Sequence, residues 1–363
     1  MTRLLSRLRS WTTSVPLAAA VLLAAVWGRH PGVFLAVVIA IALAGAVLAA
    51  VHHAEVVAHR VGEPFGSLVL AVAVTVIEVG LIVTLMISGG PETASLARDT
   101  VFAAVMITVN GILGLCLLVG AIKSGLAVFN AEGTGAALAT VATLATMCLV
   151  LPTFTTSEAG PEFSTAQLTF AAIVSLLLYG LFVFTQTVRH RDFFLPVEDE
   201  ATRPDAHAAP PSARKAAASA ALLLVALVGV VGLAKVESKS IEDGLAAIGL
   251  PHAFVGVVIA LLVLLPETIA AVRAAQRNQI QISLNLALGS AMASIGLTIP
   301  TIAVATIWLD GPLVLGLGAT QMVLLALTVV VGVLTVVPGR ATRLQGGVHL
   351  VLMAAFIFLA INP

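Results

Sequence analysis

The chain has 363 residues, of which 60% are hydrophobic and only 10% are charged, and its formal net charge at pH 7 is zero. A soluble domain normally has about 25% charged residues, so the composition excludes an ordinary soluble globular protein. Apolar runs of roughly 20 residues recur along the chain, which is typical of an all-α, polytopic protein of the lipid bilayer. The zero net charge gives no indication of a nucleic acid partner.

The hydropathy pattern predicts about 11 transmembrane helices. The candidate spans are residues 13–28, 33–52, 64–87, 101–122, 133–152, 165–188, 216–235, 253–272, 280–308, 313–337 and 343–361. Residues 1–30 have a basic head and an apolar core, as a signal peptide has, but no small-residue cleavage site stands out. We therefore expect a retained N-terminal helix. Cys116 and Cys148 lie in apolar runs and are predicted to be buried thiols.

Residues 189–215 form the single long connection between spans. The segment is charged, rich in Pro and Ala, and contains the acidic run VEDE. This composition predicts a solvated acidic linker between two halves of the chain, 33–188 and 216–363.

The distribution of Lys and Arg predicts how the chain lies in the membrane. With a cytoplasmic N-terminus, 14 of the 18 basic residues fall on the cytoplasmic side. The four on the other side are Arg29, Arg98, Lys235 and Lys239. We therefore expect a multi-pass protein of the inner membrane with a cytoplasmic linker and an extracytoplasmic C-terminus. The pattern leaves the oligomeric state open.

The two halves of the chain repeat one another. Each half opens its unit with a glutamate, Glu55 or Glu242. Each then places a second glutamate in the middle of an apolar run, Glu78 or Glu267. These runs cross the membrane in opposite directions in the predicted topology, so the repeats are inverted. The expected fold is two inverted five-helix repeats plus one extra N-terminal helix, and such repeats are typical of secondary transporters.

Glu78 and Glu267 are the acidic residues predicted to lie well inside apolar spans, and no Lys or Arg lies mid-span to pair with them. At matching points of inverted repeats, the two carboxylates would meet near the axis that relates the repeats. Ca²⁺ would neutralise both, because it prefers oxygen ligands. Without a metal the carboxylates would repel each other and take up protons. The pair can therefore hold one Ca²⁺ or two protons, as an antiporter requires; the alternative is a pair of protonated glutamates that join helices by hydrogen bonds.

Small polar residues near these glutamates are candidate supporting ligands for the cation. They are Thr75, one turn before Glu78, together with Asn110, Ser290 and Ser294 on the helices that follow each glutamate. Singly, such residues are usually packing groups in a membrane helix. Pro266 and Gly289 are expected to break or loosen their helices and to release backbone carbonyls as ligands, although a simple kink at Pro266 fits equally well.

A second group of residues near the span ends is predicted to line a proton or cation path, or to gate it. This group comprises His53, Glu55, Glu132 and Glu242. The spacing HHAEVVAH around His53 is not the HExxH of zinc hydrolases, and an exposed interfacial helix is the simpler interpretation. Glu132 also fits a carboxylate that stabilises the start of a helix.

Four blocks of the sequence now show a resemblance to a known family: HHAEVVAHRVGEPFG, AVAVTVIEVGLI, FNAEGTGAALATVATLA and LLPETIAAVRAAQRNQIQISLNLALGSAMASIGLTIP. They resemble the bacterial calcium/proton antiporters of the cation/calcium exchanger superfamily. The resemblance implies ten core helices plus one, and Glu78 and Glu267 as shared ligands of Ca²⁺ and H⁺. Some family members are described as sodium or potassium/proton antiporters. This chain has Ile77 where many exchangers have Pro, and Val263-Leu264-Leu265 instead of a Ser/Thr run.

We therefore expect a secondary transporter, without a cofactor, that exchanges cytoplasmic Ca²⁺ for protons by alternating access. The alternative on the same fold is a Na⁺(K⁺)/H⁺ antiporter. An intramembrane enzyme is not expected, because no mid-span His neighbours a Ser or Cys and His349 stands alone near the start of the last span. The short connections and the matched glutamates argue against a channel.

Overall fold

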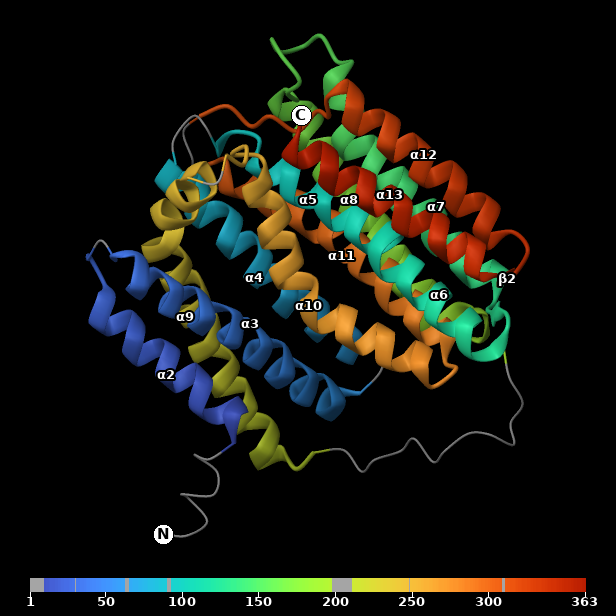
Figure 1. Ribbon diagram of the computed structural model, residues 1–363, viewed down its shortest axis with the longest axis horizontal. Coiled ribbons are helices and arrows are strands. Elements are labelled where there is room, and N and C mark those ends of the chain that lie inside the picture. Colours follow the sequence, from blue (N-terminus) through green and yellow to red (C-terminus); the bar gives the residue numbers. More distant parts are fainter. Residues whose placement is uncertain are drawn as a thin grey trace. The chain divides into compact units, whose positions relative to one another are not determined.

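The structure is a computed structural model, and it describes residues 10–29, 31–62, 65–89, 93–197, 211–247, 249–308 and 311–363. Figure 1 shows that the described chain is almost wholly helical. The helices are α2 (Trp11–Val26), α3 (Val33–Val61), α4 (Phe65–Gly89), α5 (Leu96–Met106), α6 (Leu113–Ser124), α7 (Ala131–Ala145), α8 (Thr165–Phe184), α9 (Ala213–Ala247), α10 (Phe254–Gln276), α11 (Ile280–Ala305), α12 (Ala319–Val336) and α13 (Arg343–Ile361). Two short strands, β1 (Ala127–Val128) and β2 (Arg340–Ala341), pair antiparallel.

The predicted all-α membrane fold is confirmed. Within the described ranges, 10 helical segments are long and apolar enough to cross a membrane, and α2 is a shorter apolar helix of 16 residues. One of the ten, Leu96–Ser124, joins α5 and α6 through a π-helical turn at Ile107–Ile112. Both cysteines are buried free thiols, as predicted.

The chain divides into two compact units that cut across the two repeated halves. Unit 1 comprises Met1–Thr93 and Asp205–Val255, and therefore contains α2, α3, α4 and α9. Unit 2 comprises Ala94–Pro204 and Gly256–Pro363, and contains the remaining helices apart from the first residues of α10.

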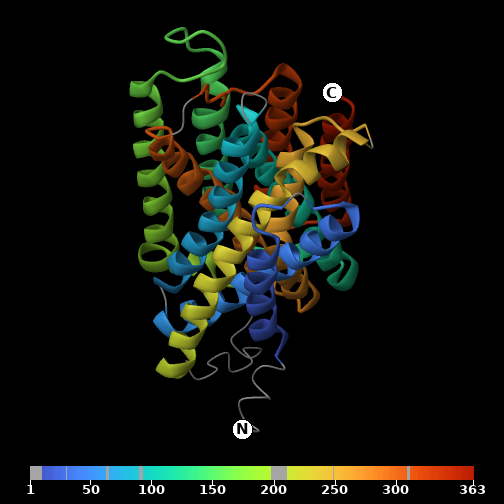
Figure 2. The ribbon, with the colours of Figure 1, turned by 90° about the vertical axis from the view of Figure 1, so that its left-hand side faces the viewer.

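In unit 1, α2 runs parallel to α9, and Figure 2 shows the two helices side by side. A Cβ on Gly229 would lie 3.4 Å from Cβ of Ala19, and a Cβ on Gly232 would lie 2.8 Å from Cδ1 of Leu23. The order of these two contacts fixes the parallel direction. The two glycines let the helices approach closely, as small residues do in membrane helix packing.

The other helices of unit 1 follow from this pair. Nε2 of His53, near the end of α3, lies 2.8 Å from the carbonyl oxygen of Thr12 at the start of α2, so α3 runs antiparallel to α2. The next helix, α4, packs against both α3 and α9. A Cβ on Gly80 would lie 2.7 Å from Cγ2 of Val231, so α4 and α9 are in close contact at this level.

In unit 2, α6 and α13 cross at two glycines. A Cβ on Gly346 would lie 2.7 Å from the backbone nitrogen of Leu118 and 2.9 Å from the carbonyl oxygen of Gly114. A Cβ on Gly114 would in turn lie 2.7 Å from Cβ of His349. The crossing therefore brings two backbones together and sets His349 against the helix that continues from the π-helical turn.

The segment before α12 is extended, which corrects the prediction of a span from residue 313. Val314 donates its N–H to the carbonyl oxygen of Ala94, Gly316 donates to Pro161, and Leu317 donates to Leu149, with distances of 3.1, 2.9 and 2.7 Å. The leucines of this segment are buried. Hydropathy predicted a helix because the residues are apolar, but here the backbone hydrogen bonds go to three other segments instead.

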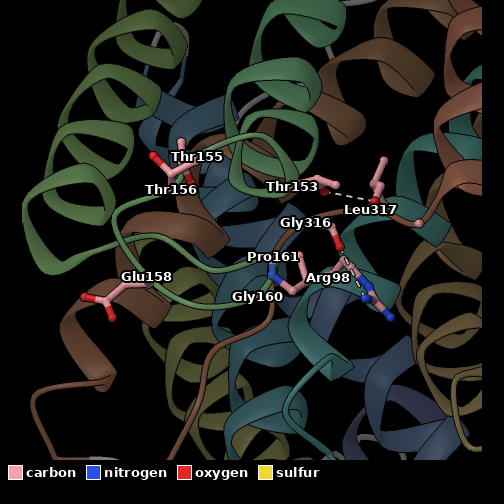
Figure 3. Close-up of a pocket in the computed structure, with 10 residues that line it drawn as sticks. Arg98, Thr153, Thr155, Thr156, Glu158, Gly160, Pro161, Gly316 and Leu317 are labelled. Atoms are coloured by element: carbon pink, nitrogen blue, oxygen red, sulfur yellow. Dashed lines mark hydrogen bonds between the residues drawn. The ribbon is translucent and has the colours of Figure 1, made fainter.

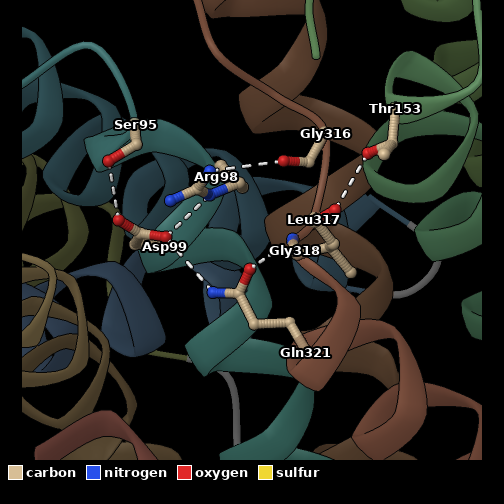
Figure 4. Close-up of polar contacts among 8 residues, drawn as sticks. All are labelled: Ser95, Arg98, Asp99, Thr153, Gly316, Leu317, Gly318 and Gln321. Atoms are coloured by element: carbon tan, nitrogen blue, oxygen red, sulfur yellow. Dashed lines mark hydrogen bonds and ion pairs between the residues drawn. The ribbon is translucent and has the colours of Figure 1, made fainter. Parts of the chain in front are cut away.

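A polar cluster at the N-terminal end of α5 holds this segment in place (Figure 4). Asp99 is 5% exposed, and its carboxylate accepts from Nε of Arg98 at 2.8 Å, from Oγ of Ser95 at 2.9 Å and from Nε2 of Gln321 at 3.5 Å. Arg98 also donates to the carbonyl oxygen of Gly316 at 3.3 Å. The buried charge of Asp99 is therefore compensated by a neighbouring cation and by two further donors.

The structure contradicts a helix break at two positions and one predicted helix end. Pro266 and Gly289 do not break their helices, since α10 and α11 run through them without interruption. The span predicted to end at residue 235 lies in α9, which continues to Ala247. The sequence KVESKSIED is polar, but it keeps a helical spacing of buried positions at Glu237 and Ser238, and hydropathy alone does not detect such a continuation.

The α6–α13 crossing can be tested with two adjacent glycines. We expect Gly346→Ala to lower the free energy of unfolding by about 1–3 kcal/mol, because the added methyl group has no room against the backbone of Leu118. Gly347→Ala is the control, since a Cβ there meets nothing within 4 Å. Thermal unfolding in detergent measures both, and equal midpoints for the two variants would contradict the close crossing.

The Arg98–Asp99 pair provides a second test. The two side chains are 17% and 4% exposed, so Arg98→Met leaves a buried carboxylate without its cation and should cost about 3–5 kcal/mol of stability. Adding Asp99→Asn removes the stranded charge and should recover part of the loss. Thermal unfolding of the single and double variants measures both effects. A double variant no more stable than Arg98→Met would show that the unpaired charge of Asp99 does not cause the loss of stability.

Candidate functional site

Glu78 and Thr75 lie on α4, in unit 1. They are one helical turn apart, and Glu78 is 4% exposed while Thr75 is 6% exposed. A carboxyl group at this depth of an apolar helix is costly and usually marks an ion or proton path. The structure therefore retains the feature that singled Glu78 out in the sequence, a buried acid in a span.

Glu267 lies on α10, in unit 2, directly after Pro266. The residue is half-buried, and its Oε2 atom is shielded from solvent. Pro266 has no N–H, so it cannot donate to the carbonyl oxygen of Leu262 one turn earlier in the unbroken helix. The proline thus leaves a carbonyl oxygen without its helical donor close to the carboxyl group.

The helical rise places Ser290 nearer than Ser294 to the level of Glu267 along the paired helices. Oγ of Ser283 on α11 donates to the carbonyl oxygen of Ala271 on α10 at 2.7 Å, and α11 returns antiparallel to α10. At about 1.5 Å per residue from this contact, Ser290 lies about 4.5 Å beyond the level of Glu267 along the helix axis. Ser294 lies about 10 Å beyond that level.

Asn110 occupies the π-helical turn and is completely buried. Its Nδ2 donates to Oγ1 of Thr328 at 2.9 Å, and its Oδ1 lies 3.1 Å from Nδ1 of His349. Nε2 of His349 lies 3.1 Å from Oγ1 of Thr335, so His349 does not stand alone, contrary to the sequence-based expectation. Both ends of the Asn110 amide are therefore engaged with α12 and α13, and π-helical turns of this kind are frequent at functional sites.

The predicted path residues differ in their surroundings. His53 is 3% exposed and bonded to the carbonyl oxygen of Thr12, whereas Glu55 on the same helix is exposed. Glu132 is exposed in the first turn of α7, where its N–H donates to Oδ1 of the N-cap residue Asn130 at 2.9 Å. The side chain of Glu242 lies outside the described residues.

The candidate ligands are therefore divided between the two units. Glu78 and Thr75 belong to unit 1, and Glu267, Asn110, Ser290 and Ser294 belong to unit 2. Among the described residues, no three or more His, Cys, Asp or Glu side chains are grouped so that they could hold a metal ion. The role of the two glutamates as a pair stays a prediction.

A hollow of about 640 Å³ lies in unit 2 beside Arg98, and Figure 3 shows the residues that line it. Its wall includes the side chains of Thr153, Thr155, Thr156 and Glu158. Oγ1 of Thr153 donates to the carbonyl oxygen of Leu317 at 2.9 Å, which ties the hollow to the extended segment before α12. In the predicted orientation this hollow lies on the extracytoplasmic side, and it presents hydroxyl and carboxylate oxygens to the solvent there.

Sequence reasoning missed three buried ionisable residues. Asp99 and Glu237 were assigned to span ends, and His349 was left without a partner, yet the three are 5%, 3% and 0% exposed. For Glu237 a signal was present, because Val230, Leu233 and Ala234 precede it at helical spacing and are also buried. The partners of Asp99 and His349 come from distant helices and leave no local signal.

Comparison with known proteins places this fold among cation exchangers. The model of the sodium/calcium exchanger protein family matches residues 31–188 and again residues 218–362, once in each half of the chain. A putative ionic transporter, y4hA, of Sinorhizobium fredii is 49% identical over 88% of this chain and 87% of its own length. The sodium-potassium/proton antiporter ChaA of Escherichia coli K12 is 36% identical over 87% of this chain and 86% of its own.

A solved structure shares the fold at low sequence identity. The crystal structure of the H⁺/Ca²⁺ exchanger CAX superposes with a TM-score of 0.70 and 16% identity, over 96% of this chain and 86% of that one. The two family matches together cover most of the chain, and two relatives match it over more than four-fifths of its length. This chain therefore belongs to the sodium/calcium exchanger protein family, whose members are membrane transporters and not enzymes.

Proposed function

We propose that this transporter moves Ca²⁺ out of the cytoplasm in exchange for protons, by alternating access. The observation that carries the proposal is the matched pair of glutamates, Glu78 and Glu267, one in each family match and each in an apolar membrane helix. No lysine or arginine lies within either apolar run to neutralise the carboxyl groups. Their own membrane helices therefore supply no basic side chain, and a bound cation or proton is the ligand that we propose for them.

Protons and a hard cation are the two ligands that such carboxyl groups can share. With Ca²⁺ bound, both carboxyl groups would be ionised and would act as oxygen ligands. The carbonyl oxygen of Leu262 and the hydroxyl oxygens of Ser290 and Thr75 would be further ligands of the cation. When the cation leaves, the two carboxylates would be unstable in a low dielectric and would take up protons. Binding of one ligand thus excludes the other, and this exclusion couples the two fluxes.

The cargo has two candidates. The fold of the H⁺/Ca²⁺ exchanger CAX supports Ca²⁺, but only as an analogy of fold. The relative ChaA, named as a sodium-potassium/proton antiporter, supports Na⁺ or K⁺ and is closer in sequence, at 36% identity. The apolar run Val263-Leu264-Leu265 before Pro266 also supplies few hydroxyl ligands. Two carboxyl groups could hold one monovalent cation together with one proton, so the second candidate uses the same residues.

Asn110 and the path residues complete the proposal. Asn110 would act as a ligand only if its amide were released from Thr328 or His349, and otherwise it would hold α12 and α13 at the π-helical turn. His53, Glu55, Glu132 and Glu242 are proposed to lie along the path of the ions. The inner membrane, a cytoplasmic N-terminus and an extracytoplasmic C-terminus are proposed from the charge bias.

The shared-glutamate mechanism is tested by Glu78→Gln and Glu267→Gln in proteoliposomes. We expect each change to lower proton-driven ⁴⁵Ca²⁺ uptake by at least about 100-fold, because an amide cannot exchange a proton for a cation. Asp192→Asn is the control, since this acid is exposed near residues 191–194, away from any span. Uptake that survives both glutamine changes would overturn the mechanism.

The cargo is tested separately in everted membrane vesicles. A fluorescent pH probe reports the release of protons when CaCl₂, NaCl or KCl is added in turn. We expect the largest response to CaCl₂ and a response abolished by Glu267→Gln. A response to NaCl or KCl with none to CaCl₂ would establish the monovalent alternative.

A further inference from the structure

Unit 1 contains a second buried carboxyl group besides that of Glu78. Glu237 on α9 is 3% exposed, and its Oε2 atom has no hydrogen-bond partner among the described residues. It follows Val230, Leu233 and Ala234 on the buried side of the helix, and each of these three is at most 2% exposed. The carboxyl group therefore sits in an apolar stripe.

Asp99 shows how this fold stabilises a buried acid that remains charged. Its carboxylate has a guanidinium group at 2.8 Å and accepts from a serine and a glutamine. Oε2 of Glu237 is buried and has no hydrogen-bond donor among the described residues. A carboxylate that has lost its water and gained no donor is unstable, whereas a protonated carboxyl group is tolerated much better.

The two lysines closest in sequence do not neutralise Glu237. Lys235 and Lys239 are exposed and lie two residues before and after it, which places them on the opposite side of the helix. Nζ of Lys235 lies over the ring of Trp27, 5.5 Å from its centroid. Both lysines line a surface hollow of about 390 Å³ together with Trp27 and Arg29.

The level of Glu237 along the unit can be derived from the helix contacts. Gly80 of α4 faces Val231 of α9. The helix α3 is antiparallel to both α2 and α4, so α2 and α4 run in the same direction. Because α2 is parallel to α9, α4 is parallel to α9 as well. Glu237 lies about 9 Å beyond Val231, and Glu78 lies about 3 Å before Gly80. Glu237 is therefore displaced by about 12 Å from the level of Glu78, toward the C-terminal end of α9.

Arg29, just beyond the end of α2, lines the same hollow as the two lysines, and the remaining ionisable groups on the packed helices lie farther from Glu237. The helix α2 has none between Trp11 and Val26, and α4 has only Glu78. The ionisable residues of α3, from His52 to Arg60, begin near the level of Thr12, about 22 Å along α2 from Trp27. On the C-terminal side, Asp243 is exposed, His252 lies beyond the end of α9, and the side chain of Glu242 is outside the described residues.

We propose that Glu237 is a proton-binding site on the extracytoplasmic side of Glu78, through which protons reach the cation site. This inference rests on the proposed proton-coupled antiport and adds a residue to its proton path. The Glu237 carboxylate takes a proton from a hydronium ion, which leaves water. The carboxyl group then gives that proton, through water, to the Glu78 carboxylate after the cation has left. One O–H bond breaks and one forms at each step.

The position of the group supports this role. In the predicted topology α9 ends on the extracytoplasmic side, so Glu237 lies between that surface and Glu78. A separation of about 12 Å exceeds the reach of a direct hydrogen bond, so water has to bridge it. Protonated Glu237 is neutral, so it needs no basic residue to compensate its charge and is compatible with the apolar stripe around it.

The test uses Glu237→Gln, which imitates the protonated form, with Asp243→Asn as the matched control on the exposed side of the same helix. Two fluxes are measured in proteoliposomes: ΔpH-driven ⁴⁵Ca²⁺ uptake, and ⁴⁵Ca²⁺/Ca²⁺ exchange without a pH gradient, which needs no net proton movement. We expect Glu237→Gln to slow the first by about ten-fold or more and to flatten its pH profile, while the second stays within two-fold. The control should match the wild type in both.

Direct proton binding is measured as well. Infrared difference spectra of the wild type between low and high external pH should contain a band of a protonated carboxyl group that Glu237→Gln removes and Asp243→Asn retains. If Glu237→Gln is poorly folded, Glu237→Asp takes its place; the shortened acid should keep this band with a shifted midpoint. A wild-type pH profile together with an unchanged infrared band, in whichever of these variants folds, would overturn the inference.

The outcome also separates this inference from the proposed function. If the wild type shows no proton-coupled flux of Ca²⁺, Na⁺ or K⁺, the proposed antiport itself fails. If the wild type is proton-coupled and Glu78→Gln abolishes the flux while Glu237→Gln changes nothing, the antiport stands and only the role of Glu237 fails.

Discussion

A carboxyl group inside a membrane helix has lost the water that would stabilise its charge, and the protein has to compensate for that loss. The acid Asp99 is compensated within the chain, by Arg98 and two further donors, and it anchors the extended segment before α12. The acids Glu78 and Glu267 have no basic residue within their own apolar runs. Asp99 is thus a structural acid, and the proposed function assigns Glu78 and Glu267 to transport.

Close backbone contacts are the second constraint on the architecture. Lipid gives no hydrophobic driving force between helices, so packing depends on small residues that allow backbones to approach. Gly114 and Gly346 do this where α6 crosses α13, and Gly229 and Gly232 do it where α9 meets α2. The first crossing has a chemical result, because it sets His349 against the π-helical turn and joins it to Asn110. A polar network is thus positioned by residues that carry no polar side chain.

The fold was predictable from the sequence because apolar length and charge bias are written along the chain without reference to distant contacts. The failures occurred where those contacts decide the structure. Leu313–Leu317 is apolar but extended, because its backbone bonds go to three other segments. The polar end of α9 is helical, because Glu237 and Ser238 continue its buried side. For the site, the buried acid at position 78 was predictable from its apolar neighbours, whereas the partners of Asn110 on α12 and α13 lie 218 and 239 residues away.

The contact between α2 and α9 has a consequence for the first helix of the chain. Residues 1–30 resemble a secretion signal in composition, but in the fold α2 covers the two glycines of α9 and receives the ring nitrogen of His53 at its first turn. Without this segment, Gly229 and Gly232 of α9 would be uncovered. The buried imidazole of His53 would lose the carbonyl oxygen of Thr12, which accepts its hydrogen bond. The helix α2, which is extra to the repeats, thus packs on α9 as part of the fold. An affinity tag is therefore better attached at the C-terminus.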